Sequence, residues 1–379
     1  MAGQSLGIGS QAVIEKHGLQ KLFEVLKAKG YHVVGPTVRN GVIIYDELKS
    51  IDDLPVGWTE EQEGAAYRLK RQEGRAFFDY GPGPDSLKKF LYPPAVSLWR
   101  AEREDTGLKA ARETGQIPKF AFVGVRPCDL HAVAIYDKVL LSGEYADPSY
   151  ALRRKNIFVV AINCRKAGGT CFCVSMKTGP KATVGFDLAL TEILENDRHY
   201  FVVDVGSEAG AEILGEVPHR EATESEVAAA EKVIAKTAGQ MGRVLDTVGL
   251  REFLYSNLEH PHWDDIAARC LTCGNCTMVC PTCFCTTVED VTDLAGGTAE
   301  RRRRWDSCFT EDFSYIHGGS VRATAKSRYR QWMTHKLAAW IDQFGTPGCV
   351  GCGRCITWCP VGIDITEETR ALREKEAAG

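Results

Sequence analysis

The sequence lacks the features by which several classes of protein are recognised. Its longest uninterrupted apolar run, Ile157–Ile162, has six residues, far short of the roughly 20 that a membrane-spanning helix needs. The first residues carry neither a basic stretch nor a long apolar one, so we expect no signal peptide. Lys and Arg (46) nearly balance Asp and Glu (50), which argues against nucleic acid as the main partner. We therefore expect a cytoplasmic protein without a membrane span.

Motifs for the common organic cofactors are also missing. Gly7, Gly9 and Ala12 fit the spacing G-x-G-x-x-A, but too few residues precede them for the strand that a dinucleotide-binding fingerprint requires. No Walker phosphate-binding sequence and no His-Glu-x-x-His zinc motif occurs. Both ends are free of cysteine, so no nickel-type Cys-x-x-Cys pair lies near either terminus. We expect no catalytic residue here, and we expect the substrate chemistry to reside on other chains.

What the sequence has in abundance is cysteine, with 15 in 379 residues. None precedes residue 128, four lie within 128–173 and eleven within 270–359. Because a cytoplasmic chain keeps its thiols reduced, this pattern indicates metal binding rather than disulfides. At roughly 100–200 residues per domain, the distribution predicts two domains, residues 1–245 and 246–379.

The first domain is predicted to be α/β with a small, partly parallel sheet. Apolar residues at helical spacing in 19–26 predict an amphipathic helix, and Asn40-Gly41 predicts a hairpin turn between two strands. Further on, Phe120–Val125 and Ile157–Ile162 are buried-strand candidates, and a helix ending near Leu141 lies between them. This order predicts a βαβ unit with parallel strands.

The second domain is predicted to be mainly helical and ferredoxin-like. Before it, near the end of the first domain, a capping-box pattern at Thr223 and Glu226 starts a helical stretch, and more helical pattern leads to the dense cysteines. A long insert at 286–348 separates two cysteine runs. We expect this insert to loop out, return and make contacts of its own.

The strongest signal is a doubled ferredoxin motif. The pattern Cys-x2-Cys-x2-Cys-x3-Cys-Pro begins at Cys270 and again at Cys349. In two-cluster ferredoxins the fourth cysteine of each run ligates the other cluster, whereas zinc sites separate their Cys-x-x-Cys pairs by a longer loop. We predict one [4Fe–4S] cluster on a first ferredoxin set, Cys270, Cys273, Cys276 and Cys359. We predict another on a second ferredoxin set, Cys280, Cys349, Cys352 and Cys355.

A further group of four cysteines lies in the first domain. Two of them closely follow the predicted strands, and Gly168-Gly169 gives the next loop freedom to return. The carboxyl ends of parallel strands share one sheet edge, where ligands bind. We predict a third [4Fe–4S] cluster, held through iron, on this N-terminal set, Cys128, Cys164, Cys171 and Cys173. Zinc, or a set of inert buried thiols, is the alternative.

Three cysteines remain, and we call them the insert cysteines: Cys283, Cys285 and Cys308. They are one short of a cubane ligand set and have no spacing signature, so we predict that they pack near the clusters. Arg301–Arg304 is a dense basic run, and a second basic stretch reaches Lys336. Such runs are either solvated faces or a positive surface that tunes clusters or docks an acidic partner.

Several segments together resemble one known family. They are Gly124–Leu130, Asn163-Cys164, Thr170–Met176, Phe186–Leu190, Trp305–Cys308, Arg328–Lys336 and Gly351–Cys355. With the doubled motif they resemble the iron–sulfur beta subunit of cytoplasmic NAD(P)-linked nickel–iron hydrogenases, also called sulfhydrogenases. The A subunit of anaerobic sulfite reductase is a close relative with the same layout. The likeness runs from about residue 75 onward.

The resemblance implies a non-catalytic electron-transfer subunit of a hydrogenase complex. One partner would be a flavin subunit that binds NAD(P)H, and the others would be the small and large hydrogenase subunits. The alternative is the A subunit of an anaerobic sulfite or sulfur reductase, whose partner is a sulfite reductase catalytic subunit. Rivals of another class are a redox-sensing iron–sulfur module and an enzyme that reduces a sulfur compound at the N-terminal set.

Overall fold

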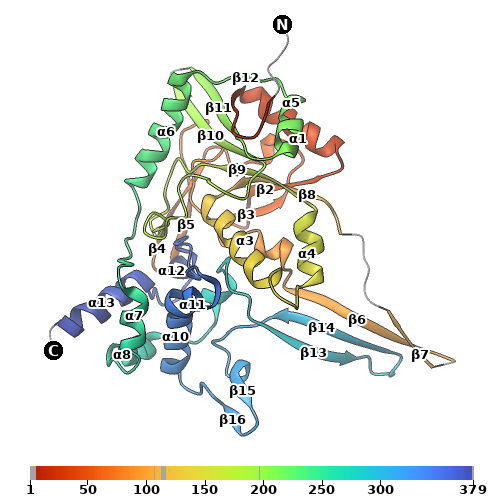
Figure 1. Cartoon of the computed structure of the whole chain (residues 1–379), viewed down its shortest axis with the longest axis vertical. Coiled ribbons are helices and arrows are strands. Elements are labelled where there is room, and N and C mark those ends of the chain that lie inside the picture. The colour runs from red at the N-terminus through yellow and green to blue at the C-terminus, as the bar shows by residue number, and fades with distance from the viewer. Residues whose placement is uncertain (1–5, 106, 112–116, 196, 378–379) are drawn as a thin grey trace.

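A large mixed sheet organises the N-terminal part of the protein. The computed structural model describes residues 6–105, 107–111, 117–195 and 197–377. The sheet, in the upper half of Figure 1, has eight strands in the order β12-β1-β11-β10-β9-β8-β2-β3. Their bounds are β1 Gln11–Glu15, β2 His32–Arg39, β3 Val42–Glu47, β8 Phe120–Val125, β9 Ile157–Ile162, β10 Leu188–Glu195, β11 Arg198–Val205 and β12 Arg220–Glu221.

The sheet is partly parallel, as predicted, but it is not small. Strands β2, β8, β9 and β10 lie side by side in this order, and each pairs in parallel with the next. Strand β11 pairs antiparallel with β10, and β1 and β12 follow it toward the edge. The expectation of a small sheet is wrong because half of its strands come from stretches in which the sequence pattern predicted none.

The predicted local elements of this part are confirmed. Strands β2 and β3 form an antiparallel hairpin, and Asn40 and Gly41 in its turn have positive φ angles of 49° and 76°, as a two-residue turn of this kind requires. The predicted helix is α3 (Pro127–Leu140), which with the unpredicted helix α4 (Pro148–Lys155) lies between β8 and β9, and these two strands pair in parallel. Helix α6 (Glu224–Ala238) begins with the capping box of Thr223 and Glu226.

Helices cover both faces of the sheet. Side chains of α1 (Lys16–Ala28) and α5 (Glu208–Gly215) pack on one face, together with Ala121 and Val123 of β8. Side chains of α3 and α4 (Pro148–Lys155) pack with Phe122 and Val125 on the opposite face, where α6 also lies. Since both faces of β8 and β9 are buried, these strands read as continuous apolar runs.

The C-terminal part forms a second core of helices, in the lower left of Figure 1. It buries Trp263, Trp332 and Met333 together with Phe172 of the N-terminal part. The helical segments are α7 Leu250–Ser256, α8 His262–Arg269, α9 Asn275–Met278, α10 Ala325–Thr334, a π-helical turn His335–Ala339, α11 Trp340–Phe344, α12 Arg354–Thr357 and α13 Ile365–Ala377.

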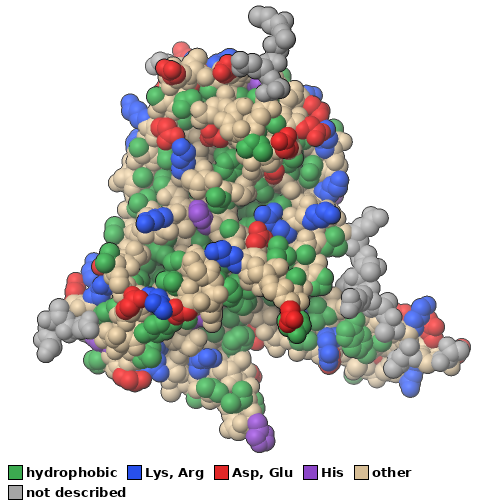
Figure 2. Space-filling model, viewed as in Figure 1, with side chains coloured by type: hydrophobic (Ala, Val, Ile, Leu, Met, Phe, Trp, Pro, Cys, Tyr) green, Lys and Arg blue, Asp and Glu red, His purple; other side chains and the backbone are tan. Residues whose placement is uncertain are grey.

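The insert at 286–348 contributes a β-arm. Strands β13 (Thr286–Thr292) and β14 (Thr298–Trp305) form a hairpin, and β14 pairs with β6 (Ala95–Glu104), which pairs with β7 (Gly107–Ala111). Figures 1 and 2 show this four-stranded sheet projecting from the body. The insert therefore joins the N-terminal part through a strand pairing that no local sequence pattern predicts.

The basic run of the insert is largely paired within the arm. Arg301 forms a two-bond ion pair with Asp290, at 2.7 Å for each bond. Glu289 accepts from both Arg302 and Arg304, at 2.8 and 3.0 Å. These cross-strand pairs agree with a solvated face and leave less free positive charge for docking than the sequence implies.

The remaining strands and helix complete the fold around the cysteines. Two small hairpins pair β4 (Trp58–Glu63) with β5 (Ala66–Arg71) and β15 (Tyr315–Ile316) with β16 (Gly319–Ser320). The short helix α2 (Lys88–Leu91) precedes β6. The β4–β5 hairpin reaches the C-terminal part, where the backbone N–H of Ala65 donates to the carbonyl of Ile356.

Candidate metal centres

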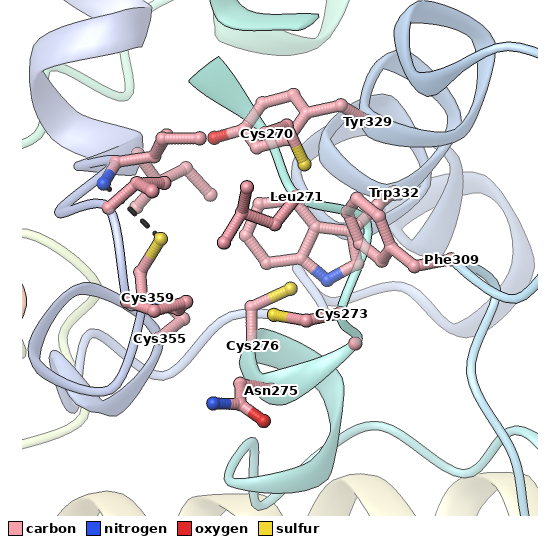
Figure 3. A pocket seen from close by; sticks show the side chains of 15 residues that line it. Cys270, Leu271, Cys273, Asn275, Cys276, Phe309, Tyr329, Trp332, Cys355 and Cys359 are labelled. Atoms are coloured by element: carbon pink, nitrogen blue, oxygen red, sulfur yellow. Dashed lines mark hydrogen bonds between the residues drawn. The ribbon is translucent and has the colours of Figure 1, made fainter.

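Four cysteines from two distant segments line one cavity in the C-terminal part. The loop after α8 and helix α9 supply three of them, and the second residue after α12 supplies the fourth. Their sulfur atoms surround one space in Figure 3, beside the rings of Phe309, Tyr329 and Trp332. The cavity has a volume of about 440 Å³ including its mouth. The cysteines are the first ferredoxin set, Cys270, Cys273, Cys276 and Cys359.

The loop can present three thiols because its backbone is tightly turned. Thr272 and Gly274 have positive φ angles of 52° and 76°. A side chain at Gly274 would approach the Ser307 hydroxyl to 3.0 Å, so glycine permits both the conformation and the close packing. The backbone N–H of Thr272 donates to the Cys270 sulfur, and that of Ile363 donates to the Cys359 sulfur, each at 3.4 Å.

Cys280 does not line this cavity but lies with the second cysteine run. Burial raises the pKa of Cys349, Cys352 and Cys355, and a Cys280 thiolate raises each of these pKa values further. Gly351 donates its backbone N–H to the Cys349 sulfur at 3.4 Å. The structure thus gathers the second ferredoxin set as the crossed pattern requires, with Cys280 apart from Cys270.

A buried lysine accompanies the second ferredoxin set. Lys336, 4% exposed, lies in the π-helical turn. Its Nζ donates to the Cys280 sulfur at 3.3 Å, to the Thr282 hydroxyl at 3.0 Å and to the Gly348 carbonyl at 2.9 Å. Burial lowers the pKa of Lys336, but the combined thiolate charge at Cys280, Cys283 and Cys349 outweighs this and holds it above its usual value. The ammonium group is therefore a fixed positive charge beside Cys280.

The N-terminal set also lines one cavity, of about 340 Å³ including its mouth. Cys128 lies in the first turn of α3, just after β8, and Cys164 follows β9, so the neighbouring parallel strands bring them to one sheet edge. The loop after Gly168-Gly169 returns Cys171 and Cys173 to the same cavity. Burial raises the pKa of Cys164, and the adjacent guanidinium of Arg126 opposes that rise.

Cysteines of the second ferredoxin set border both cavities. Cys352 lines the cavity of the N-terminal set, and Cys355 lines that of the first ferredoxin set. The backbone N–H of Phe172 donates to the Gly351 carbonyl at 2.8 Å, and the Thr178 hydroxyl donates to the Val350 carbonyl at 2.6 Å. The second ferredoxin set therefore lies between the other two.

The donor chemistry of the three sets fits iron–sulfur clusters. Thiolates are soft ligands that suit such clusters. Burial raises the pKa of Cys276, and thiolates at Cys270 and Cys359 raise it more, so several thiolates here need a compensating cationic group. Within the described part of the chain, no three His, Cys, Asp or Glu side chains are placed to hold a single metal ion.

Comparison with known proteins gives the family. Residues 269–363 match the model of the 4Fe-4S dicluster domain. The chain is 32% identical over 357 residues to "Sulfhydrogenase 2 subunit beta" of Pyrococcus furiosus, covering 93% of this chain and 96% of that protein. This chain belongs to the sulfhydrogenase beta-subunit family. It is an iron–sulfur electron-transfer subunit, and its dicluster domain implies two [4Fe–4S] clusters.

The structure of this sulfhydrogenase beta-subunit homologue thus brings together each of the three predicted cysteine sets. Their assignment as ligands stays a prediction. Of the insert cysteines, Cys283 lies beside Cys280 of the second ferredoxin set. None of the helices in the described residues is long and apolar enough to span a membrane.

Sequence reasoning missed the buried charges of this family member. Lys336 was grouped with a surface basic stretch, and nothing pointed to Lys88, which is 5% exposed and approaches the Cys280 carbonyl at 3.5 Å. Nor did it single out Arg354 and Asp129, which form a buried ion pair between two cysteine sets. Spacing signals find metal ligands, but a single buried charge leaves no periodic signal in one sequence.

Proposed function

We propose that this chain relays electrons between a flavin subunit that binds NAD(P)H and a nickel–iron hydrogenase module of small and large subunits, in the cytoplasm. The chain itself is inferred to be non-catalytic. One observation carries the proposal: the second ferredoxin set borders the cavities of the other two, so the three cysteine sets adjoin one another. A row of neighbouring sites suits electron transport, whereas a sensor exposes one labile site.

We infer that each set holds one [4Fe–4S] cluster, and when bound these clusters supply one-electron redox chemistry. The first ferredoxin set comprises Cys270, Cys273, Cys276 and Cys359. The second ferredoxin set comprises Cys280, Cys349, Cys352 and Cys355. The N-terminal set comprises Cys128, Cys164, Cys171 and Cys173. The dicluster match supports the first two, and the convergence of four thiols on one cavity supports the third.

Charged and aromatic side chains near the three cysteine sets position these sites and set their electrostatic environment. Lys336 and Lys88 place positive charge near Cys280, and such charge favours the more negative, reduced state of a bound group. Aromatic side chains form part of the wall around the first ferredoxin set. Arg354, which lies between Cys352 and Cys355 of the second ferredoxin set, binds Asp129, the residue after Cys128 of the N-terminal set.

We also infer two domains, residues 1–245 and 246–379. Helix α6 ends at Ala238 and α7 begins at Leu250, on either side of this boundary. The pairing of β6 with β14 and the contacts of Gly351 cross it, so tests of the clusters need the full chain.

The ligand assignment is tested by matched cysteine substitutions in the full chain, purified without oxygen. The unchanged protein should contain about twelve irons, from three four-iron sites. Cys280→Ser should deplete the site of the second ferredoxin set and leave the electron paramagnetic resonance signal of the first. The matched control Cys285→Ser, five residues on, should retain all the iron. Zinc without iron, or damage by Cys280→Ser to the first ferredoxin set alone, would overturn the assignment.

The partners are tested by purifying the complex from its source through an affinity tag on this chain. Co-purification of a flavin subunit and a nickel-binding large subunit is the expected result. A siroheme subunit in their place would refute the hydrogenase assignment and identify the sulfite reductase branch instead.

A further inference from the structure

The insert cysteines share a cavity that none of the three cysteine sets uses. Cys283, Cys285 and Cys308 line it together with His335 and Lys336. It lies between the base of the β13–β14 hairpin and the π-helical turn, and it has a volume of about 800 Å³ including its mouth. All three cysteines are half-buried and form part of the wall of this open cavity.

Two of these thiols are in direct contact. Cys285 precedes β13 and Cys308 follows β14, and the two ends of the hairpin are held together where the backbone N–H of Asp306 donates to the Cys285 carbonyl at 2.9 Å. The Cys308 thiol donates a hydrogen bond to the Cys285 sulfur. A disulfide needs two cysteines brought this close by the backbone, and the hairpin provides that proximity.

The number of thiols favours thiol chemistry over a fourth cluster. A cubane bound by cysteine alone takes four thiolates, whereas three cysteines line this cavity. Cys283 is the third thiol, but its hydrogen bond goes to Cys280, outside the pair. The arrangement is therefore one pair of thiols beside a proposed ligand.

The surroundings make one member of the pair the better nucleophile. The hydrogen bond from Cys308 lowers the pKa of Cys285 to about 7, with further contributions from Lys336 and Lys88. The same hydrogen bond raises the pKa of Cys308, which keeps that sulfur protonated. A half-buried thiol in an electropositive cavity is the environment in which reactive cysteines occur.

We propose that Cys285 and Cys308 form a redox-active pair that exchanges with low-molecular-weight disulfides entering this cavity. The Cys285 thiolate attacks one sulfur of the disulfide, forms a mixed disulfide and releases one thiolate, which takes a proton from solvent. Cys308 then loses its proton and attacks the Cys285 sulfur, which releases the second thiolate. The protein pair is oxidised by two electrons, and the small disulfide is reduced to two thiols.

The proposal does not depend on the cluster ligands inferred above. It gives this family member a two-electron thiol site next to the second ferredoxin set. Its chemistry is tested on the full chain with its iron in place, using glutathione disulfide as the probe.

The experiment maps cysteine linkages by mass spectrometry after anaerobic incubation with glutathione disulfide. The unchanged protein should form a Cys285–Cys308 disulfide, release two glutathiones and revert on treatment with dithiothreitol. Cys308→Ser should stop at a glutathione adduct on Cys285, because the second attack is missing. Cys285→Ser should slow glutathione release by about tenfold or more, since Cys308 is the poorer nucleophile. The matched control Cys283→Ser should retain the linkage.

Iron content separates failure of this proposal from failure of the cluster assignment. If Cys285→Ser or Cys308→Ser lowers the iron content, these residues are metal ligands and the proposal is wrong. If the unchanged protein keeps its iron and forms no Cys285–Cys308 linkage, the proposal is equally wrong. A normal linkage in a preparation whose iron does not follow the three cysteine sets would instead overturn only the cluster assignment.

Discussion

Arg354 and Asp129 form a two-bond ion pair in the interior, although 225 residues separate them in the sequence. The distances are 2.7 Å from Nη1 to Oδ1 and 2.9 Å from Nη2 to Oδ2, and each residue is 1% exposed. Arg354 also donates to the carbonyls of Gly83 and Asp85. The pair ties the loop between Cys352 and Cys355 to the first turn of α3, next to Cys128. It therefore fixes two cysteine sets relative to each other.

Removing the acid of this pair should destabilise the protein strongly. Asp129→Ala leaves the Arg354 guanidinium buried without its counter-charge, and a broken buried pair typically costs about 3–5 kcal/mol. We expect a clearly lowered midpoint of thermal unfolding in the anaerobic protein. The control Asp290→Ala, which breaks the exposed pair with Arg301, should leave the midpoint unchanged within error. Equal midpoints for Asp129→Ala and the unchanged protein would show that the pair does not hold the interface.

Lys336 should set the potential of the site that contains Cys280. Its ammonium lies 3.3 Å from the Cys280 sulfur and is buried from solvent screening. Lys336→Met removes a positive charge that favours the reduced state, so the midpoint potential should fall. We expect a shift of about 60 mV or more, the value for a tenfold change in a one-electron equilibrium, in a titration followed by electron paramagnetic resonance.

A matched control removes the same charge at the surface. The control is Lys326→Met. Lys326 lies in α10, where it pairs with Asp264 and is accessible to solvent. Since exposed charges are screened by salt, this variant should leave the potential unchanged. A rise in potential for Lys336→Met, or equal shifts for the two variants, would contradict the assigned role.

The sequence predicted the parts of the fold that depend on local pattern. The Asn40-Gly41 turn, the capping box at Thr223 and the two apolar strands around α3 each follow from a few neighbouring residues. The gathering of Cys128 with Cys164 followed from one rule as well, because neighbouring parallel strands end at the same edge.

What the sequence could not predict depends on contacts between distant segments. The pairing of β14 with β6 joins residues about 200 positions apart. The sequence of one strand does not specify which other strand it pairs with. Lys336 belongs to a basic stretch and resembles a surface residue. Only the π-helical turn and the Cys280 sulfur beside it explain its burial.

A methyl group at Gly353 should disrupt the boundary between two cysteine sets. Gly353 has a φ of +75°, and a side chain there would meet the Thr170 carbonyl at 2.3 Å. Gly353→Ala would strain the loop of Cys352 and push it from the loop of Cys171. We expect iron content to fall by about four to eight atoms per chain, from one or both four-iron sites, as measured by elemental analysis.

The control for this glycine is Gly215, at the end of α5. A side chain there meets nothing within 4 Å, and its backbone conformation is ordinary. Gly215→Ala should therefore keep full iron content. Full iron in Gly353→Ala would mean that the contact with Thr170 relaxes without disturbing either site.

The reactivity of Cys285 should depend on pH in a manner set by Cys308. The charged and titratable groups around Cys285 are Cys308, Cys283, Lys88, Lys336 and His335. The hydrogen bond from Cys308 lowers the pKa of Cys285 from its ordinary value of 9.0 to about 7. Because only the thiolate reacts, alkylation by iodoacetamide should be slow below this pKa, rise through it and level off above it. Peptide mapping of the alkylated full chain follows the rate at Cys285 directly.

Cys308→Ala removes the hydrogen bond and should move the midpoint of the alkylation profile toward higher pH, where the ordinary thiol titrates. The alkylation rate at neutral pH should then drop, although access to the cavity is, if anything, improved by the smaller side chain. Cys283→Ala, which empties a similar volume in the same cavity without touching this bond, should keep the midpoint near that of the unchanged protein. An unchanged midpoint in Cys308→Ala would mean that the lysines, and not the contact with Cys308, make Cys285 reactive.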